Sequence, residues 1–434
     1  MSRVEFEDIQ KIKPSVQVDA RKALEVYAKI LKKGVVDKPV VIDRETGVVL
    51  EGHELFQALD LLSPKKIPVL KVDISEIEVE LIDPSLGSPR AIIEAGLGKP
   101  KLPPGSFKAI VRVPEINTPL EELGVWKKAG RENLRVFNNT LELLYKNWPT
   151  PFIRLTSLST KKRSVWAKLE GFNPFSNSVK DRIGWSMIME ALERGELKEI
   201  LYEATSTNTG IALASIANII GKKAKLFVPQ SIQKVSDTFL KVLGAEVVRA
   251  PVSLTVEVIK QVDEEAKKMG ASHLNQFENG ANFKVHLKYT AKELDEQLRS
   301  IGLKPTHIIG GLGTSGHMSA ISIYFKNKYE DVKIIGVQPA PEEVIPGIRR
   351  VETGMKWIHW VEFDQIVDVT RKEAIEGALS IARNEGLLIG LSSGAVVHAF
   401  KKIAEKEGVY VLVFPDTGYK YAEQFEEYFS TVRQ

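Results

Sequence analysis

The chain has 434 residues, 43% of them hydrophobic and 27% charged, with a formal net charge of +4 at pH 7; this is typical of a folded globular protein of two or three domains and excludes a disordered chain. It contains no cysteine and no zinc-binding histidine motif, so disulfides, thiolate metal sites and a cysteine nucleophile are excluded and no metal site is expected. Because no apolar run could span a bilayer, no secretory signal is visible and both charge signs are interspersed, we expect a cytoplasmic enzyme that binds neither membrane nor nucleic acid.

Residues 1–110 predict a small α+β domain. Helical patterns run over residues 20–33 and 53–62. Short apolar runs typical of strands lie at residues 40–42, 47–50 and 67–72. A stretch rich in proline and glycine, residues 96–107, then indicates a loop or boundary.

A connecting region follows this first domain. Charged residues with a helical pattern extend over residues 120–146 and end before Trp148 and Pro149. We therefore assign residues 111–148 to a linker and helical connection, and residues 149–434 to a catalytic domain.

In the catalytic domain, apolar runs of strand length alternate with amphipathic stretches of helical length. The expected strands are residues 165–169, 201–204, 224–228, 246–248, 307–309, 333–337 and 410–414. The expected helices include residues 180–194, 209–220, 254–268, 282–299 and 315–327. This alternation predicts α/β structure, with parallel sheets covered by helices on both faces. Since ligands bind at the carboxyl ends of parallel strands, the joints between strand and helix are the candidate sites.

The first joint, NPFSNSVKDR at residues 173–182, places Lys180 just inside a helix start. A lone lysine in such a place is usually a surface residue beside a capping serine. The functional alternative is a desolvated lysine with a lowered pKa, which can form a Schiff base.

Two further joints offer anion sites. ATSTNTG at residues 204–210 places hydroxyl and amide side chains at a helix N-terminus, where either a plain cap or a carboxylate site is expected. GGLGTSG at residues 310–316 contains the spacing of a dinucleotide-binding loop. The next strand ends in Gln338 and Pro339 rather than in the acidic residue that a dinucleotide requires, so a cradle for one phosphate group is favoured.

The last two segments are less specific taken one at a time. GLSSGA at residues 390–395 opens a long helix and could be only another cap. Arg349 and Arg350 follow a Pro-Gly turn, which is usually solvated, although arginine is well suited to bidentate phosphate binding.

In this order the motifs resemble fold-type II pyridoxal phosphate enzymes of the cysteine synthase and cystathionine β-synthase family. The resemblance covers about residues 145–425 and includes TPFIRL at residues 150–155 besides the segments above. Within the family the chain looks most like the archaeal O-phosphoserine sulfhydrylases. That likeness rests on NQFENGANFKVH (275–286), QPAPEEVIPGIRRVETGMKW (338–357) and PDTGYKY (415–421).

The resemblance implies a fold of two doubly wound subdomains, a pyridoxal 5'-phosphate cofactor and a role for each matching residue. Lys180 would be the Schiff-base lysine and catalytic base. The remaining cofactor contacts would be Asn208 on the ring hydroxyl, Gly313, Thr314, Ser315 and Gly316 on the phosphate, and Ser393 at the pyridine nitrogen. The substrate carboxylate would be bound by Thr205, Ser206 and Gln276, and a substrate phosphate by Arg349 with Thr255 nearby.

These assignments predict a β-replacement that converts O-phospho-L-serine, and possibly O-acetyl-L-serine, with sulfide into L-cysteine. Three alternatives stay open: a cystathionine β-synthase, a synthase with an amine nucleophile, and a regulatory protein that only binds the cofactor. The family implies a homodimer. The lack of cysteine and abundant Glu and Lys favour a thermophilic source.

The N-terminal domain resembles the ParB-like and free serine kinase fold over residues 40–73. The resemblance is incomplete, because EGHEL at residues 51–55 replaces an acidic and basic turn. A kinase needs cations for nucleotide phosphates, and Glu54 and Leu55 supply none. We therefore expect this domain to be non-catalytic.

Overall fold

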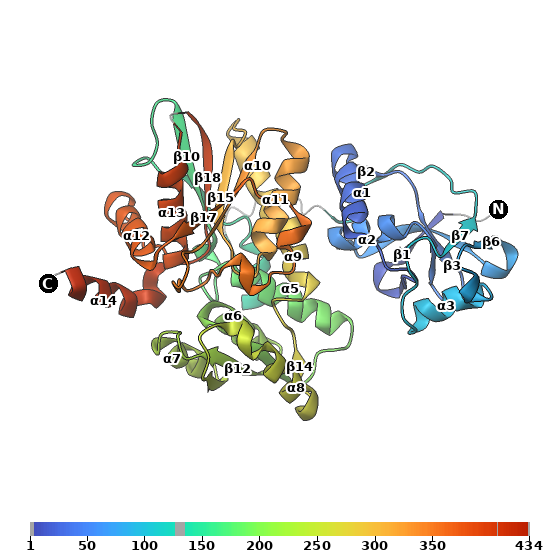
Figure 1. Ribbon diagram of the computed structural model, residues 1–434, viewed down its shortest axis with the longest axis horizontal. Coiled ribbons are helices and arrows are strands. Elements are labelled where there is room, and N and C mark those ends of the chain that lie inside the picture. The colour runs from blue at the N-terminus through green and yellow to red at the C-terminus, as the bar shows by residue number, and fades with distance from the viewer. Residues whose placement is uncertain (1–3, 126–134, 406, 433–434) are drawn as a thin grey trace. The chain divides into compact units, whose positions relative to one another are not determined.

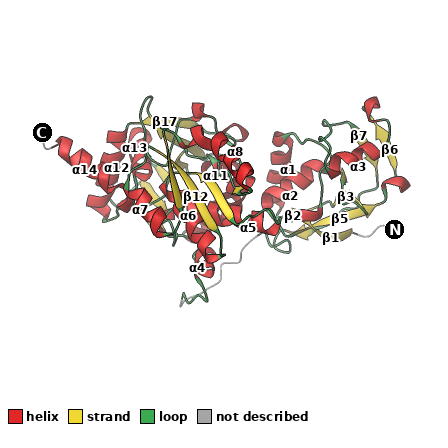
Figure 2. Ribbon diagram, turned by 90° about the horizontal axis from the view of Figure 1, so that it is seen from below, coloured by secondary structure: helices red, strands yellow, loops and turns green. Residues whose placement is uncertain are grey.

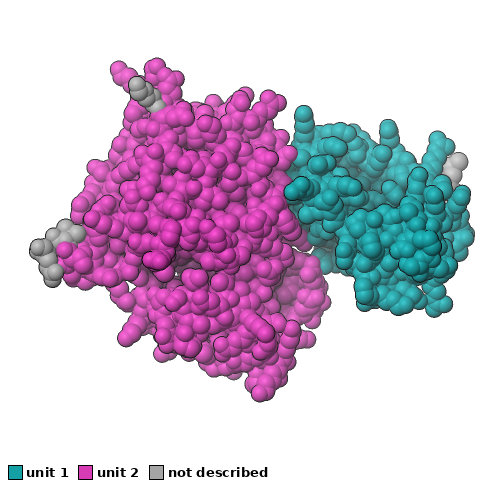
Figure 3. Space-filling model, in the orientation of Figure 1, with its two compact units in different colours: residues 1–131 teal, residues 132–434 magenta. Residues whose placement is uncertain are grey.

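A computed structural model describes residues 4–125, 135–405 and 407–432 (Figures 1 and 2). The chain forms two compact units, Met1–Arg131 and Glu132–Gln434, which Figure 3 shows in different colours. Within the described ranges, no helix is both long enough and apolar enough to cross a membrane.

The first unit is built on a four-stranded sheet in the order β1-β5-β3-β4. Its strands are β1 (Val4–Asp8), β3 (Val40–Asp43), β4 (Val49–Glu51) and β5 (Lys66–Val72), and its helices are α1 (Ala20–Lys33), α2 (His53–Leu62) and α3 (Arg90–Leu97). The predicted helices at residues 20–33 and 53–62 are confirmed. Two small antiparallel pairs accompany the sheet: β2 (Val35–Val36) with β8 (Thr118–Pro119), and β6 (Glu78–Leu81) with β7 (Phe107–Ile110). Because β8 pairs with β2, this unit extends beyond residue 110.

The prediction of a helix over residues 120–146 is wrong at residues 120–125 and 135–139, and it is confirmed at residues 140–146. Residues 120–124 form a turn, residues 126–134 lie outside the described part of the chain, and the helix α4 covers only Thr140–Lys146. Leu120 and Leu123 are both buried, and their spacing of three resembles one face of a helix. The backbone N–H of Leu120 instead donates to Gly34 O at 3.0 Å, next to the β2–β8 pair.

The second unit contains a six-stranded sheet in the order β17-β16-β15-β18-β10-β9. Its strands are β9 (Phe152–Arg154), β10 (Arg163–Leu169), β15 (His307–Gly311), β16 (Lys333–Pro339), β17 (Gln365–Val369) and β18 (Gly408–Phe414). All neighbours pair in parallel except β9, which is antiparallel to β10. In Figure 1, α12 (Arg371–Glu385) and α13 (Leu391–Ile403) lie on one side of this sheet, and α10 (Lys292–Ser300) and α11 (Gly316–Lys328) on the other.

A second, four-stranded sheet is parallel throughout, in the order β13-β12-β11-β14. Its strands are β11 (Ile200–Ala204), β12 (Lys223–Pro229), β13 (Glu246–Ala250) and β14 (Ser272–His273). The remaining helices of the unit are α5 (Lys180–Glu193), α6 (Thr207–Ile219), α7 (Val235–Val242), α8 (Ile259–Met269), α9 (Gly280–Val285) and α14 (Ala422–Val432). The predicted strands and the parallel α/β class are therefore confirmed.

Two predicted helices differ in detail from the structure. The stretch 254–268 begins with a 3₁₀ turn, Thr255–Val258, before α8. The stretch 282–299 is interrupted by a π-helical segment, His286–Ala291, between α9 and α10. The wider turns of a π-helical segment change the direction of the side chains that follow it, and such segments are frequent at functional sites.

Candidate active site

A pocket in the second unit gathers the segments that follow the strands of both sheets. It encloses about 630 Å³ of empty space, counted out to its open mouth. Seven of the twelve predicted site residues line it: Lys180, Ser206, Thr255, Gln276, Gly313, Thr314 and Arg349. The other five do not line it. Thr205, Asn208, Ser315 and Gly316 stand within two residues of ones that do, and Ser393 lies in the first turn of α13. The side chains come from the carboxyl ends of parallel strands, as expected for an open α/β sheet.

Lys180 is the first residue of α5 and lines the pocket. The preceding loop is fixed by Asp181, whose carboxylate accepts the N–H groups of Phe175 at 2.7 Å and Ser176 at 2.8 Å. The N–H of Lys180 donates to Ser178 Oγ at 3.1 Å. Burial lowers the pKa of the Lys180 amine to about 8, and the nearby positive charge of Arg349 adds to this while Asp416 opposes it. The amine is therefore a much better nucleophile and base at neutral pH than an exposed lysine.

The glycine loop follows β15 and opens α11. Ser315 adopts a left-handed conformation with φ of 69° at the start of the helix. A Cβ at Gly313 would come within 2.5 Å of Gly347 O, and a Cβ at Gly316 would overlap Asn282 Oδ1. The backbone is thus packed too closely for side chains here, which leaves its N–H groups as the available donors at this helix start.

Three side chains that the resemblance assigns to the cofactor have buried polar atoms without a hydrogen-bond partner among the described residues. They are Asn208 Oδ1, Ser315 Oγ and Ser393 Oγ. A buried polar atom left unsatisfied typically costs about 1–3 kcal/mol. Together with the nucleophilic lysine and the glycine loop, these atoms fit a polar ligand that carries an aldehyde and a phosphate group, such as pyridoxal phosphate.

The predicted carboxylate-binding residues follow two neighbouring strands, β11 and β14. Ser206 precedes α6, and Gln276 follows β14. Gln276 is buried; its Nε2 donates to Ala204 O at 3.0 Å and its Oε1 accepts from Thr209 Oγ1 at 2.8 Å. Thr205 is fully buried, and its hydroxyl donates to Ser206 O at 2.7 Å, so Thr205 shapes the loop while Ser206 lines the pocket.

Arg349 and Arg350 have different environments. Arg350 pairs with Glu352 at 2.9 Å and with Asp368 at 3.2 Å. Arg349 is 9% exposed, lines the pocket and hydrogen-bonds only neutral oxygens, those of Gly313 and Thr353. No carboxylate of the described residues lies within ion-pair distance of it. Burial lowers the pKa of Arg349 to about 10, which leaves a positive charge available to an anion in the pocket.

Two residues at the site were missed by the sequence analysis. Asp416, just after β18, accepts from Asn208 Nδ2 at 2.8 Å and from the Tyr421 hydroxyl at 2.5 Å. Asn282 donates to both Gln276 O at 2.8 Å and Thr314 Oγ1 at 2.9 Å. The signal for Asp416 was present, since it follows a predicted strand at the same sheet edge as the other candidates.

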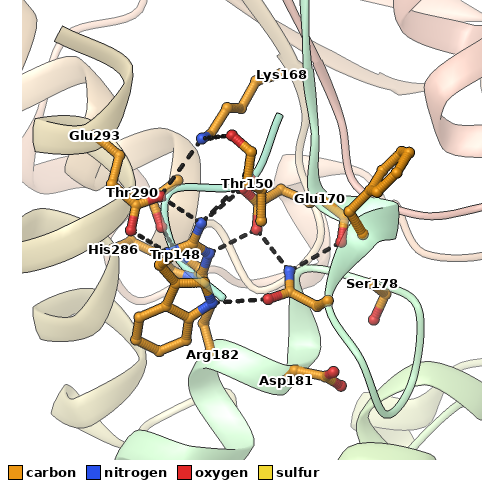
Figure 4. Close-up of polar contacts among 12 residues, drawn as sticks. Trp148, Thr150, Lys168, Glu170, Ser178, Asp181, Arg182, His286, Thr290 and Glu293 are labelled. Atoms are coloured by element: carbon orange, nitrogen blue, oxygen red, sulfur yellow. Dashed lines mark hydrogen bonds and ion pairs between the residues drawn. The ribbon is translucent and has the colours of Figure 1, made fainter. Parts of the chain in front are cut away.

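A buried charge network, defined by Lys168, Glu170, Arg182 and Glu293, lies next to the first turn of α5 (Figure 4). Arg182 donates to both oxygens of Glu170, at 2.6 and 3.0 Å, and to both oxygens of Glu293, at 3.0 and 2.7 Å. Its guanidinium also lies 4.6 Å from the Trp148 ring centroid. Because Lys180 and Arg182 share this helical turn, the network fixes the turn that carries the pocket lysine.

Comparison with known proteins agrees with this geometry. Residues 143–416 match the family described as "Pyridoxal-phosphate dependent enzyme". Cysteine synthase B of Escherichia coli (strain K12) is 34% identical over 305 residues, which cover 67% of this chain and 98% of that protein. Cysteine synthase of Aquifex aeolicus is 35% identical over 271 residues, 59% of this chain and 82% of that protein.

Solved structures show the same architecture. O-ureido-L-serine synthase superposes with a TM-score of 0.59 at 26% identity and covers 66% of this chain and 93% of its own. A hydrogen sulfide-producing enzyme from Fusobacterium nucleatum gives a TM-score of 0.60 at 29% identity, covering 66% of this chain and 100% of its own. All of these matches leave out a large part of this chain, which they do not describe.

Proposed function

This chain belongs to the family of pyridoxal-phosphate dependent enzymes, with pyridoxal 5'-phosphate as its cofactor, and from that premise we propose that it is a cysteine synthase that uses O-phospho-L-serine and sulfide. The reaction breaks the Cβ–O bond of the donor, releases inorganic phosphate and forms a Cβ–S bond with sulfide. The bound cofactor supplies an electron sink that labilises bonds at Cα and Cβ of an amino acid.

In this proposal the protein binds the cofactor and the donor, orients them, and moves one proton. The glycine loop, Gly313–Gly316, would hold the cofactor phosphate through backbone N–H groups, and the unpartnered atoms of Asn208 and Ser393 would find partners on its ring. The Lys180 amine, uncharged in a large fraction near its pKa of about 8, would hold the cofactor, and once the substrate amine has displaced it, the amine would be free to take the proton from Cα. Ser206 and Gln276 bind the substrate carboxylate, with Thr205 shaping their loop.

One observation supports a phosphorylated donor more than any other: the buried Arg349 lines the pocket with no carboxylate of the described residues within ion-pair distance, although Glu278 is near enough to raise its pKa slightly against the effect of burial. An acetyl leaving group carries no charge and makes no use of it, whereas a phosphate forms charge-assisted hydrogen bonds with a guanidinium. Thr255, at the start of a 3₁₀ turn, lines the same pocket and adds a hydroxyl.

The test compares O-phosphoserine with O-acetylserine in steady-state kinetics of the holoenzyme. In Arg349→Ala we expect kcat/KM for O-phosphoserine to fall about a hundredfold, the usual effect of removing a charged partner. Activity with O-acetylserine should fall much less, so the ratio of the two donors is the readout. Arg350→Ala is the matched control, because Arg350 is already paired with carboxylates. Equal kcat/KM values that do not respond to Arg349→Ala contradict a phosphate-specific enzyme.

Two measurements test the remaining parts of the proposal. Borohydride reduction of the holoenzyme followed by peptide mass spectrometry should place the pyridoxyl label on Lys180. Product analysis with sulfide, homocysteine and free amino acids as acceptors should give L-cysteine as the main product. A preference for homocysteine or an amine would assign the chain to a cystathionine β-synthase or an amine-using synthase instead.

For the first unit we propose a non-catalytic domain of the ParB-like and serine kinase type. Its turn at residues 51–55 carries His53, whose Nε2 lies 2.9 Å from Ser15 Oγ. Burial lowers the pKa of His53 to about 4, so the ring is neutral near pH 7 and offers no charge to a nucleotide phosphate. Serine kinase assays with ATP should therefore show no turnover. We further propose a homodimer, which light scattering of the purified protein tests.

A further inference from the structure

Glu203 is a fully buried carboxylate at the end of β11 that no described cation neutralises. Its two oxygens accept adjacent backbone N–H groups: Oε2 that of Asn275 at 2.9 Å, and Oε1 that of Gln276 at 3.1 Å. Asn275 has a φ of 51°, in the left-handed region that favours glycine. The carboxylate thus fixes a strained turn that the backbone alone would not favour.

The turn held by Glu203 carries a pocket residue and is joined to both neighbouring loops. The side chain of Gln276 is fixed by Thr209 and by the carbonyl of Ala204. The carbonyl of Gln276 accepts from Asn282, which also donates to Thr314 in the glycine loop. Displacement of this turn would therefore move Gln276 before it moved the other pocket residues.

We propose that Glu203 is a positioning residue that holds Gln276 where it can bind the substrate carboxylate. This inference rests on the proposed function, in which Gln276 binds that group. Each of the two adjacent N–H donors meets a separate oxygen of Glu203, whereas a glutamine presents one oxygen only and directs an NH₂ group at the other donor. Burial raises the pKa of Glu203 to about 8, although the two N–H bonds oppose this rise. Burying an ionisable group without a cation is costly to the fold, so stability alone gives no reason for this residue.

The decisive variant is Glu203→Gln, which keeps the size of the side chain but directs an NH₂ group towards one N–H donor. We expect KM for the amino-acid donor to rise about tenfold or more, with kcat and pyridoxal phosphate affinity changed less than threefold. Glu203→Asp keeps the carboxyl group but shortens the side chain. It should also raise KM with little change in kcat, to a smaller degree. This variant replaces Glu203→Gln in the test if the glutamine variant does not fold. Glu142→Gln is the control, since Glu142 is a buried glutamate that accepts a backbone N–H outside the pocket.

A second readout separates this inference from the identity of the leaving group. The wild type should discriminate against donors whose α-carboxylate is converted to an amide, and this discrimination should shrink in Glu203→Gln with either O-phosphoserine or O-acetylserine. If only the phosphate preference is absent, the choice of donor is wrong while the role of Glu203 stands. An unchanged KM in Glu203→Gln, or a joint loss of kcat, KM and cofactor affinity as in general unfolding, would overturn the inference.

Discussion

Arg349 donates a hydrogen bond from Nε to the carbonyl oxygen of Gly313 at 2.8 Å. One side chain therefore supports the glycine loop proposed for the cofactor and carries the charge proposed for the substrate. The two roles separate in Arg349→Lys, because lysine retains a positive charge but not the planar set of donors that reaches both Gly313 and Thr353.

For Arg349→Lys we expect the preference for O-phosphoserine over O-acetylserine to fall by only about tenfold, compared with about a hundredfold in Arg349→Ala. The affinity for pyridoxal phosphate should fall several-fold in both variants, because each loses the bond to the loop. Donor kinetics and cofactor titration of the apoprotein measure the two effects. A lysine variant with wild-type cofactor affinity would show that the Gly313 contact has no role there.

The amine of Lys180 provides a prediction about pH in the cofactor-free protein. Its pKa of about 8 means that about half of it is neutral at pH 8, against about 0.4% of an ordinary lysine with a pKa near 10.4. Competitive labelling with a trace amine-acylating reagent should show a midpoint near pH 8 for Lys180, while exposed lysines titrate above pH 10. A Lys180 midpoint at 10 or above would contradict the burial of the amine.

The same pKa has a consequence for stability. Between pH 8 and 10.5 the unfolded chain holds a proton on this lysine that the folded protein does not, so this group makes folding more favourable as the pH rises through that window. In urea titrations of the apoprotein, the free energy of unfolding of Lys180→Met should therefore rise less between pH 8 and pH 10.5 than that of the wild type.

The buried charge network predicts a large effect on stability. Arg182→Met leaves Glu170 and Glu293 buried without their main partner, and breaking such a pair typically costs about 3–5 kcal/mol. Arg194→Met is the matched control, because the pair of Arg194 with Glu190 is partly exposed and should contribute about 1 kcal/mol or less. Chemical denaturation of the apoprotein measures both, and equal losses would contradict the role of burial.

Glu170 adds a pH dependence with a defined sign. Burial alone raises the pKa of Glu170, but the charge and hydrogen bonds of Arg182 outweigh this and lower it to about 2. The carboxylate therefore stabilises the fold above pH 4.5, and this contribution is lost as the pH falls towards 2. The stability difference between the wild type and Glu170→Gln should shrink over that range.

The sequence located the pocket because the pocket residues follow a local rule. Lys180, Ser206 and the glycine loop each stand between a predicted strand and a predicted helix, where parallel sheets bind ligands. The roles assigned to them from the resemblance stay predictions until the variants are measured.

The contacts that the sequence analysis missed join residues that lie far apart in the chain. Arg182 bonds Glu170, 12 residues away, and Glu293, 111 residues away, and Asn208 bonds Asp416 across 208 residues. Such pairs leave no periodic pattern in the sequence. The wrong helix at residues 120–125 has a related cause, because the burial of Leu120 and Leu123 repeats the spacing of a helix where the backbone forms a turn.

The last prediction concerns the space at Gly316. A Cβ there would overlap Asn282 Oδ1, and Asn282 ties the turn of Gln276 to Thr314. We therefore expect Gly316→Ala to push Asn282 aside, to weaken pyridoxal phosphate binding by at least tenfold and to raise KM for the donor. Titration of the apoprotein with the cofactor, followed by its absorbance, measures the first effect.

The matched control for that experiment is Gly280→Ala. Gly280 begins α9, the helix that carries Asn282, and the nearest atom to an added Cβ is Lys284 Cε at 3.9 Å. The alanine should fit without displacement and leave cofactor affinity within about twofold, with a small gain in stability of about 0.4–1 kcal/mol from the less flexible unfolded chain. Of these two glycines, Gly316 lacks room for a methyl group and Gly280 does not. If both alanines weaken cofactor binding equally, the close packing at Gly316 is therefore not the cause, and a general effect on this region is.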